Sequence, residues 1–298
     1  MAAPADVIER TSEPPHLRLS HARELLAYRE ILMNLVRKEL KVKYAASVLG
    51  AVWSLLNPVV FLAVFTFVTT VLRTNIPNYP VYLLAGLLPW NLFSVSLSNG
   101  AHSVIDNGNL VKKVYFPREV LPLAAIGVAL VDFVLQSAVL LLFLVVIGYD
   151  FHPSALALYP LSFLTLLVFT VAVAFWVSAV NVRYRDIQHL IGLGLLVWFW
   201  VTPIVYPGGL VQQELASRSF LGIELWTPFL LNPLASVIFG FQRALYGTVA
   251  PGGEAVLPDV SVAWLAGVIA AVLATSLVVL WLTWRLFFRL SGDFAEEL

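Results

Sequence analysis

Residues 120–147 read VLPLAAIGVALVDFVLQSAVLLLFLVVI, and this stretch decides the class of fold. It contains a single charged side chain, Asp132. A helix needs about 20 mostly apolar residues to cross the hydrocarbon core of a bilayer. The stretch is therefore predicted to be a transmembrane helix, and the protein to be embedded in a membrane.

Five further stretches share this length and hydrophobicity. The six predicted spans cover residues 47–72, 81–105, 120–147, 155–181, 187–206 and 262–284. Of the 298 residues, 60% are hydrophobic and 12% are charged, which is too apolar for an ordinary soluble domain. We therefore expect an all-α integral membrane protein with six transmembrane helices. The predicted regions are 1–46 (N-terminal tail and interface helix), 47–286 (six-span domain) and 287–298 (C-terminal tail).

Basic residues are distributed unevenly among the segments that join the spans. With the N-terminus in the cytoplasm, 15 of the 18 Lys and Arg residues lie on the cytoplasmic side, and Arg73, Arg218 and Arg243 lie opposite. Because Lys and Arg near the ends of spans resist translocation, both termini are predicted to be cytoplasmic. The first 46 residues hold no apolar core followed by a small-residue cleavage site, so we expect no cleaved signal peptide.

Residues 24–44, ELLAYREILMNLVRKELKVKY, precede the first predicted span and are too charged to cross a membrane. Apolar residues recur at helical spacing on one side (Leu25, Tyr28, Leu32, Leu35, Val36), and basic residues occupy the other (Arg29, Lys38, Lys41). This pattern is typical of an amphipathic helix lying on the membrane surface. A soluble helix packed against a partner is the alternative.

The long segment between the last two spans, residues 207–261, contains a further apolar stretch. Residues 225–242, LWTPFLLNPLASVIFGFQ, are interrupted by Pro228 and Pro233 and are too short to span a bilayer reliably. Irregular backbone at membrane depth needs protein or water around it to satisfy its polar groups. We predict one or two half-helices that re-enter the membrane from outside. A hairpin on the external surface fits the pattern equally well.

Motifs for nucleotide hydrolysis and metal binding are absent from the sequence. It contains no G-x-x-x-x-G-K-[ST] or H-E-x-x-H pattern and no cysteine, and its five histidines are scattered. No cluster of titratable residues shares one membrane level, as acid–base catalysis would require. We therefore expect a protein that is not an enzyme and that holds no metal or cofactor of its own. Neither ATP nor nucleic acid is an expected ligand of this chain.

Asp132 and Gln136 are polar residues one helical turn apart inside the predicted third span. An ionised Asp at a helix centre costs about 2.5–3.5 kcal/mol on insertion scales, so it should be protonated, hydrogen-bonded or exposed to water. A structural polar contact is the favoured interpretation, and a role in transport is the alternative.

Aromatic and amide side chains gather in the predicted first, second and fifth spans. The set comprises Trp53, Asn57, Trp90, Phe93, Trp198, Phe199, Trp200 and Tyr206. Aromatic rings offer flat apolar faces that suit sugar rings, and Tyr and Trp add a polar tip that can meet sugar hydroxyls. These residues are candidate lining for a substrate channel. The alternative is that they anchor the spans at the membrane interfaces, where Trp and Tyr concentrate.

Five ordered motifs extend over most of the chain. They are KELKVKYAASVLGAVWSLLNP (38–58), GLLPWNLFSVSLSNG (86–100), NLVKKVYFPREVLPL (109–123), NVRYRDI (181–187), and WFWVTPIVYP (198–207) followed by LNPLASVIFGFQRALYG (231–247). Through these motifs the chain resembles the type-2 permease family of ABC transporters, in its polysaccharide-exporting branch. The resemblance implies a homodimer in a bacterial cytoplasmic membrane, joined to two copies of a separate subunit that binds ATP and Mg. The implied substrate is a polysaccharide carried on a polyprenyl diphosphate.

The loop between the second and third predicted spans, residues 106–119, corresponds to a coupling helix in that family. Asp106 or Asn107 can cap its start, and Leu110 and Val114 can form an apolar stripe. The expected coupling residues are Asn109, Leu110, Lys112, Lys113, Phe116, Pro117, Arg118 and Glu119. On charge alone, the basic residues in this loop could merely fix the topology.

The resemblance suggests roles for two further groups. Arg37, Lys41 and Lys43 could attract the diphosphate of the lipid carrier, or simply anionic head groups. Asn232, Pro233 and Arg243, within the predicted gate region 207–247, are expected to gate the outer mouth of the path.

Other functions remain open at this point. They are an exporter of a small lipid or drug, a membrane-embedded glycolipid enzyme, and a scaffold without transport activity. The glycan itself is not identified by the sequence. Arg outnumbers Lys 13 to 5, which is typical of a high-GC genome and makes a galactan-like wall polymer a reasonable expectation. O-antigen, teichoic acid and capsule polymers are alternatives.

Overall fold

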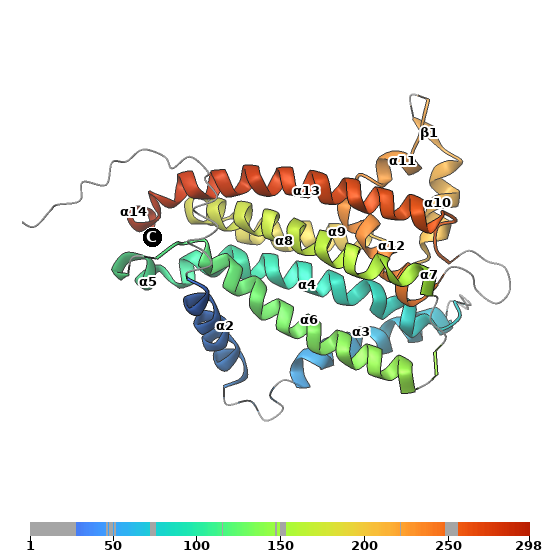
Figure 1. Cartoon of the computed structure of the whole chain (residues 1–298), viewed down its shortest axis with the longest axis horizontal. Helices are drawn as coiled ribbons and strands as arrows, with labels where there is room; N and C mark the ends of the chain where they lie inside the picture. Colours follow the sequence, from blue (N-terminus) through green and yellow to red (C-terminus); the bar gives the residue numbers. More distant parts are fainter. Residues whose placement is uncertain are drawn as a thin grey trace, which may run out of the picture.

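The computed structural model describes residues 28–45, 47, 50, 52–71, 76–114, 116–146, 148–149, 153–220, 222–247 and 256–298. Predictions for residues 1–27, which include Leu25, and for Arg73 lie outside the described residues. The described part is a bundle of long helices with one short pair of strands (Figure 1).

Five of the described helices are long and apolar enough to cross a membrane. They are α3 (Val52–Val71), α4 (Tyr79–Asp106), α6 (Val120–Val146), α8 (Leu158–Arg183), preceded by the single turn α7 (Pro153–Leu156), and α13 (Val262–Ser291). Each corresponds to one predicted span. The length of these apolar stretches therefore located five of the six predicted spans.

The remaining predicted span, residues 187–206, differs from the other five. Its helix, α9 (Ile187–Val201), has 15 residues and is followed by non-helical backbone. A helix of this length covers about 22 Å, less than a hydrocarbon core of about 30 Å. The helix ends because Pro203 disfavours helical geometry in the residue before it, and Thr202 is extended, with φ −95° and ψ 131°.

The bundle has two distinct ends (Figure 1). At the α5 end lie α5 (Gly108–Lys113), α14 (Phe294–Glu297) and the residues that join α8 to α9. At the α10 end lie α10 (Gly208–Ala216), the antiparallel strands β1 (Ser219–Phe220) and β2 (Ile223–Glu224), and α11 (Trp226–Phe229). The chain therefore builds separate sets of short elements at the two ends of its long helices.

The centre of the bundle is α4, which contacts α3, α6, α8, α9 and α12 (Pro233–Leu245). The largest fully buried side chains include Tyr82, Phe93, Phe239 and Phe241, all from α4 and α12. By contrast, only 11% of the most apolar window of α3 and 17% of that of α13 is buried within this chain. These two helices therefore present apolar surface to lipid or to another chain.

The helix α12 is a core element although it has only 13 residues. Eleven of them are buried, and α12 contacts α4, α8 and α13. Gly240 allows this close packing, because a Cβ atom there would lie 2.0 Å from Oγ of Ser162 on α8. A hairpin lying on the surface of the protein therefore does not describe this region.

The amphipathic segment before the first span forms α2 (Arg29–Tyr44), which packs against α6. Leu35 and Val36 are buried on its apolar side, while Arg37 and Lys41 are exposed. The helix therefore turns two apolar residues toward α6 and exposes two of its basic residues. The two helices pack closely at Gly127, where a Cβ atom would lie 2.7 Å from Cγ2 of Val36.

The substitution Gly127→Ala is expected to push α2 away from α6 and to destabilise the protein by about 1–3 kcal/mol, as overpacking usually does. The thermal unfolding midpoint in detergent measures this effect. Gly267→Ala on α13 is the matched control, because its Cβ would meet nothing within 4 Å. Equal midpoints for the two variants would contradict the close packing of α2 on α6.

Candidate functional site

The α5 end presents basic residues on a very short helix. Lys112 and Lys113 form its last turn and are exposed, and Val114, which follows in extended conformation, is 50% exposed. Val111, in contrast, is buried in the bundle. The helix therefore directs two ammonium groups and one apolar side chain away from the bundle.

The remaining predicted coupling residues divide between surface and interior. Asn109 is exposed, and Leu110, Pro117 and Arg118 are half-buried. Phe116 and Glu119 are buried. Because a buried side chain cannot contact another protein directly, the last two support the loop from within and do not form its outer surface.

Asn107, one of the two candidates for the cap, occupies the N-cap position of α5. Its side chain makes no capping hydrogen bond to the helix. Its Nδ2 donates to the backbone O of Ser103 on α4 at 3.0 Å, and its Oδ1 accepts a hydrogen bond from Nζ of Lys38 at 3.4 Å. Asp106, the other candidate, is the last residue of α4. Asn107 thus connects α2, α4 and the start of α5.

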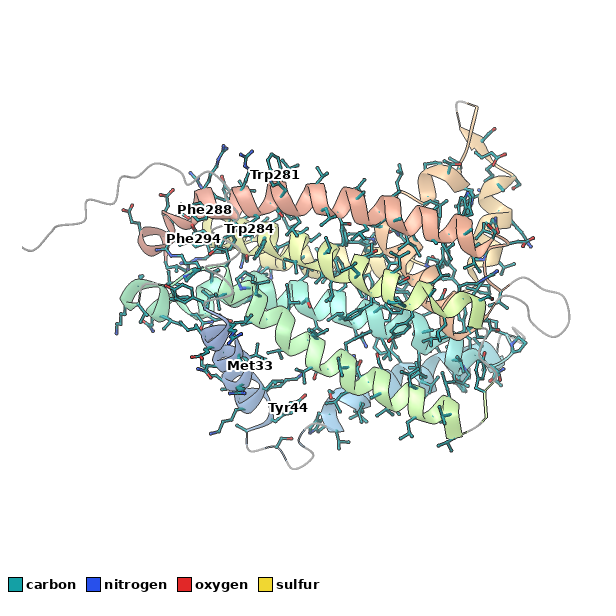
Figure 2. All side chains as sticks on the ribbon, in the orientation of Figure 1. Met33, Tyr44, Trp281, Trp284, Phe288 and Phe294 are labelled. Atoms are coloured by element: carbon teal, nitrogen blue, oxygen red, sulfur yellow. The ribbon has the colours of Figure 1, made fainter. Side chains whose placement is uncertain are left out.

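Asp132 on α6 has its polar partners at the end of α2. Nζ of Lys43 forms an ion pair with Oδ2 of Asp132, and the hydroxyl of Tyr44 donates to Oδ1 at 2.8 Å (Figure 2 labels Tyr44 at the end of α2). One turn further along α6, Nε2 of Gln136 donates to the backbone O of Ser54 on α3 at 2.6 Å. Asp132 and Gln136 therefore join α6 to α2 and to α3.

This ion pair bears on the three basic residues of α2 that were candidates for binding an anionic group. Lys43 is one of the three residues that could attract a diphosphate or anionic head groups, and its ammonium group is paired with Asp132. Arg37 and Lys41 remain exposed on the outer side of α2. The three residues therefore do not form one anion-binding cluster.

Two cavities lie along α4 and share Lys43 as a lining residue. The larger, of about 420 Å³, lies between α2, α4 and α6, and the smaller, of about 200 Å³, is bounded by α3, α4, α6 and the end of α2. Polar residues lining the larger cavity are Glu39, Lys43, Asn99, His102, Ser103, Asp106 and Asn107. Those lining the smaller are Lys43, Ser54, Asn57, Asn91, Asp132 and Gln136.

Asn91 is one of the amide side chains of the second predicted span, but the sequence reasoning missed the polar stripe on α4 to which it belongs. Asn91, Asn99, His102 and Asp106 follow one another at helical spacing and line these two cavities. Residues at intervals of three, four, seven or eight share one face of a helix, and this spacing is the signal that could have identified the stripe. It gives one face of the central helix a row of amide, imidazole and carboxylate groups.

The aromatic residues proposed as channel lining do not share one environment. Trp90, Phe93 and Phe199 are buried inside this chain. Their rings pack together, with 6.0 Å between the centroids of Trp90 and Phe93 and 5.5 Å between those of Trp90 and Phe199. These three side chains therefore hold α4 and α9 together and cannot line a path outside this chain.

The exposed members of the set lie on α3 and α9. Trp53 is 53% exposed and Trp200 is 54% exposed, and Asn57 is exposed beside Trp53. The ring of Phe65 on α3 meets that of Trp200 at 6.5 Å. Tyr206 is half-buried, and its hydroxyl donates to the backbone O of Trp200 at 2.8 Å. Trp53, Asn57 and Trp200 are thus free to contact lipid, substrate or a second chain.

Asn232 is the hub of a polar network where α9 ends and α12 begins. Its Oδ1 accepts from Nε1 of Trp198 at 2.8 Å and from the backbone N of Leu234 at 3.2 Å. Its Nδ2 donates to Oγ1 of the fully buried Thr202 at 3.1 Å. Pro233 follows as the first residue of α12, where its fixed φ suits a helix start. Asn232 therefore caps α12 and ties it to α9.

Arg243, the third predicted gate residue, lies at the other end of α12. The rise of about 1.5 Å per residue separates it from Asn232 by roughly 16 Å along the helix. Near this end, burial raises the pKa of Tyr149, and its hydroxyl donates to the backbone O of Tyr246 at 3.0 Å. The three predicted gate residues are therefore not a single cluster.

The substitution Trp198→Phe is expected to loosen the start of α12, because it keeps an aromatic ring and removes the hydrogen bond to Asn232. Oδ1 of Asn232 keeps its bond from the backbone N of Leu234, so the cost is that of one lost hydrogen bond, about 0.5–1.5 kcal/mol. The unfolding midpoint and export rate should both fall, whereas Trp200→Phe, at an exposed ring, should leave the midpoint unchanged. If Trp198 served only as a flat surface for sugar, phenylalanine would preserve both quantities.

The fold and these sites define a class of protein. A bundle of apolar helices with polar cavities along its central helix, a basic helix at one end and no nucleotide-binding motif in the sequence is typical of a membrane transport subunit. Among the described residues there is no group of three or more His, Asp or Glu side chains that could hold a metal ion. Residues 31–214 match the family model described as ABC-2 type transporter, and the chain belongs to that family.

Similar proteins cover most of the chain. An O-antigen export system permease protein RfbA from Myxococcus xanthus is 36% identical over 277 residues, which span 93% of this chain and 98% of the relative. A protein of the same description from Klebsiella pneumoniae is 33% identical over 214 residues, spanning 72% of this chain and 79% of the relative. The polysialic acid transport protein KpsM from Escherichia coli is 22% identical over 209 residues, which span 67% of this chain and 75% of the relative.

Proposed function

We propose that this chain is the transmembrane subunit of an ABC exporter that moves a lipid-linked polysaccharide out of the cytoplasm. The observation that carries the proposal is the nearly end-to-end similarity to an O-antigen export permease, at 36% identity over 93% of the chain. A relative named for polysialic acid transport supports a polysaccharide as the class of cargo. We infer a bacterial cytoplasmic membrane as the location.

The α5 end is proposed to face the cytoplasm and to receive the ATP-binding subunit. Most of the basic residues in the described part of the chain lie there, on α2, α5, the end of α8 and the end of α13. This distribution supports the orientation, because basic residues are retained on the cytoplasmic side. Lys112, Lys113 and Val114 offer two charges and one apolar contact for the partner. ATP and Mg would bind to that partner.

Two copies of the chain are proposed to enclose the path. The exposed apolar residues on α3 and the exposed face of α9 support this arrangement, since Phe199 is the buried residue of α9. A polymer-wide aqueous path needs more polar wall than one bundle of this kind provides. A symmetric pair would bring Trp53, Asn57 and Trp200 of each copy toward the shared path.

The fifth predicted span is proposed to be completed by the segment after α9 and by α12. The backbone of residues 202–206 lies against α4, where the hydroxyl of Tyr82 donates to the backbone O of Tyr206 at 2.7 Å. This contact supplies the polar partners that irregular backbone needs at membrane depth. The buried α12 would then be a re-entrant half-helix, with Asn232 at its inner end and Arg243 near the outer surface.

The lipid-linked substrate is proposed to approach from the side of α2. Arg37 and Lys41, exposed on α2, suit the diphosphate. The larger cavity suits sugars better than phosphate, because Glu39 and Asp106 add negative charge and Lys43 is already paired. Carboxylates accept hydrogen bonds from sugar hydroxyls, and side-chain amides both accept and donate them.

Deletion of the gene, followed by analysis of lipid-linked polymers, tests this function. The proposal predicts a polysaccharide that accumulates on its lipid inside the cell and disappears from the surface. An unchanged surface polymer would contradict it. Accumulation of a small lipid or drug instead would favour the alternative exporter, and an unprocessed glycolipid precursor would favour the enzyme.

A further inference from the structure

The C-terminal turn is packed against the bundle. Phe294 on α14 is 1% exposed, and the edge of its ring meets that of Phe287 on α13 with 5.5 Å between centroids. The guanidinium carbon of Arg118 lies 5.9 Å from the centroid of the Phe294 ring. Figure 2 labels Phe294 at the α5 end of the bundle. The segment predicted to be a C-terminal tail is therefore anchored by a buried aromatic side chain.

The end of α14 approaches two further helices at the α5 end of the bundle, α8 and α5. Oε1 of Glu297 lies 4.0 Å from Nε of Arg183, the last residue of α8. A Cβ atom on Gly108, the first residue of α5, would lie 3.8 Å from Cβ of Leu298. One short turn thus contacts α5, the loop after it, α8 and α13.

The short helix α5 depends on such contacts. A six-residue helix is not stable alone, because too few backbone hydrogen bonds form to offset the cost of nucleation. The helix α5 makes its main contacts with α4 and α14. Phe294 also belongs to the apolar cluster that contains Val111 of α5. Without α14, a force applied to α5 would be transmitted mainly through its junction with α4.

We propose that residues 294–298 form a clasp that holds α5 against the ends of α8 and α13, so that the three move as one body during transport. Phe294 is then a positioning residue for the coupling helix. The identity of the driving partner rests on the proposed function, whereas the contact itself does not. Movement of α5 would reach α13 and the junction of α8 with α9 directly through this clasp.

A disulfide cross-link tests whether α5 and the clasp move together. The chain has no cysteine, so Gly108→Cys with Leu298→Cys introduces a single pair. A Cβ–Cβ separation of about 3.8 Å is the usual value for a disulfide. We expect oxidation in membranes to close the bond within one chain, absent from each single variant, and export to continue. Absence of the bond, or loss of export on closing it, would overturn the proposal.

A second test separates coupling from assembly. Phe294→Ala should lower the amount of glycan exported per ATP hydrolysed about ten-fold, within the usual range for coupling between sites. Basal hydrolysis per assembled complex should be unchanged, Phe294→Leu should restore part of the ratio, and the exposed Glu296→Ala should behave as wild type. An unchanged ratio in Phe294→Ala contradicts the clasp. If the proposed function is wrong, the unmodified protein shows no ATP-dependent export, while the cross-link still reports on the contact.

Discussion

The substitution Lys113→Glu is expected to abolish polysaccharide export and the stimulation of ATP hydrolysis by substrate, while the permease remains in the membrane. Lys113 is exposed in the last turn of α5 and makes no contact that the fold needs. Reversing its charge places a carboxylate where the partner should supply an acidic group, and like charges at an interface cost several kcal/mol. The ATPase rate of the assembled complex, with and without substrate, measures the effect.

A matched control for Lys113→Glu is Arg218→Glu at the α10 end. Arg218 is exposed and pairs only weakly with Glu214, at 3.4 Å, so its reversal should change little. Export and stimulated hydrolysis at wild-type rates in Lys113→Glu would show that the basic residues of α5 only fix topology. Arg118 is less suitable for this test, because it also contacts Phe294.

The second large effect concerns the ion pair between α2 and α6. Asp132→Asn leaves the ammonium group of Lys43 beside apolar helices without its counter-charge, and Lys43→Met leaves the carboxylate unpaired. Each single substitution should lower the free energy of unfolding by about 2 kcal/mol, since hydrogen bonds to charged groups contribute amounts of this order and Lys43 is partly exposed.

The double variant Lys43→Met with Asp132→Asn should recover most of the lost stability, because it removes both charges together. Thermal unfolding and export of the two single variants and the double variant form the complete cycle. A double variant that is stable but does not export would give this pair a direct part in transport. Single variants as stable as wild type would contradict the structural role of the pair.

The long spans were predictable because apolar length is a local property of the sequence. The end of α9 was also encoded locally, by Pro203, but the length criterion extended the span to Tyr206 across it. The clasp had only a weak signal, namely Phe294 and Leu298 in a charged terminal segment. Local patterns therefore identify elements better than they define the ends of those elements.

Contacts between distant segments could not be predicted from one sequence. The pairing of Lys43 with Asp132 and of Trp198 with Asn232 depends on how the helices pack, which periodicity does not specify. For the same reason, Trp90 and Phe93 resembled channel lining although they are buried in the bundle. Of the residues predicted for the coupling loop, Lys112 and Lys113 are exposed, while Phe116 and Glu119 are interior.

Reconstitution into lipid vesicles tests the central claim most directly. The purified chain is inserted with or without its ATP-binding subunit, and the transfer of a labelled lipid-linked polysaccharide across the bilayer is followed after ATP is added. The proposed function predicts transfer only when both subunits and ATP are present. Transfer at the same rate without the ATP-binding subunit, or ATP hydrolysis by this chain alone, would contradict it.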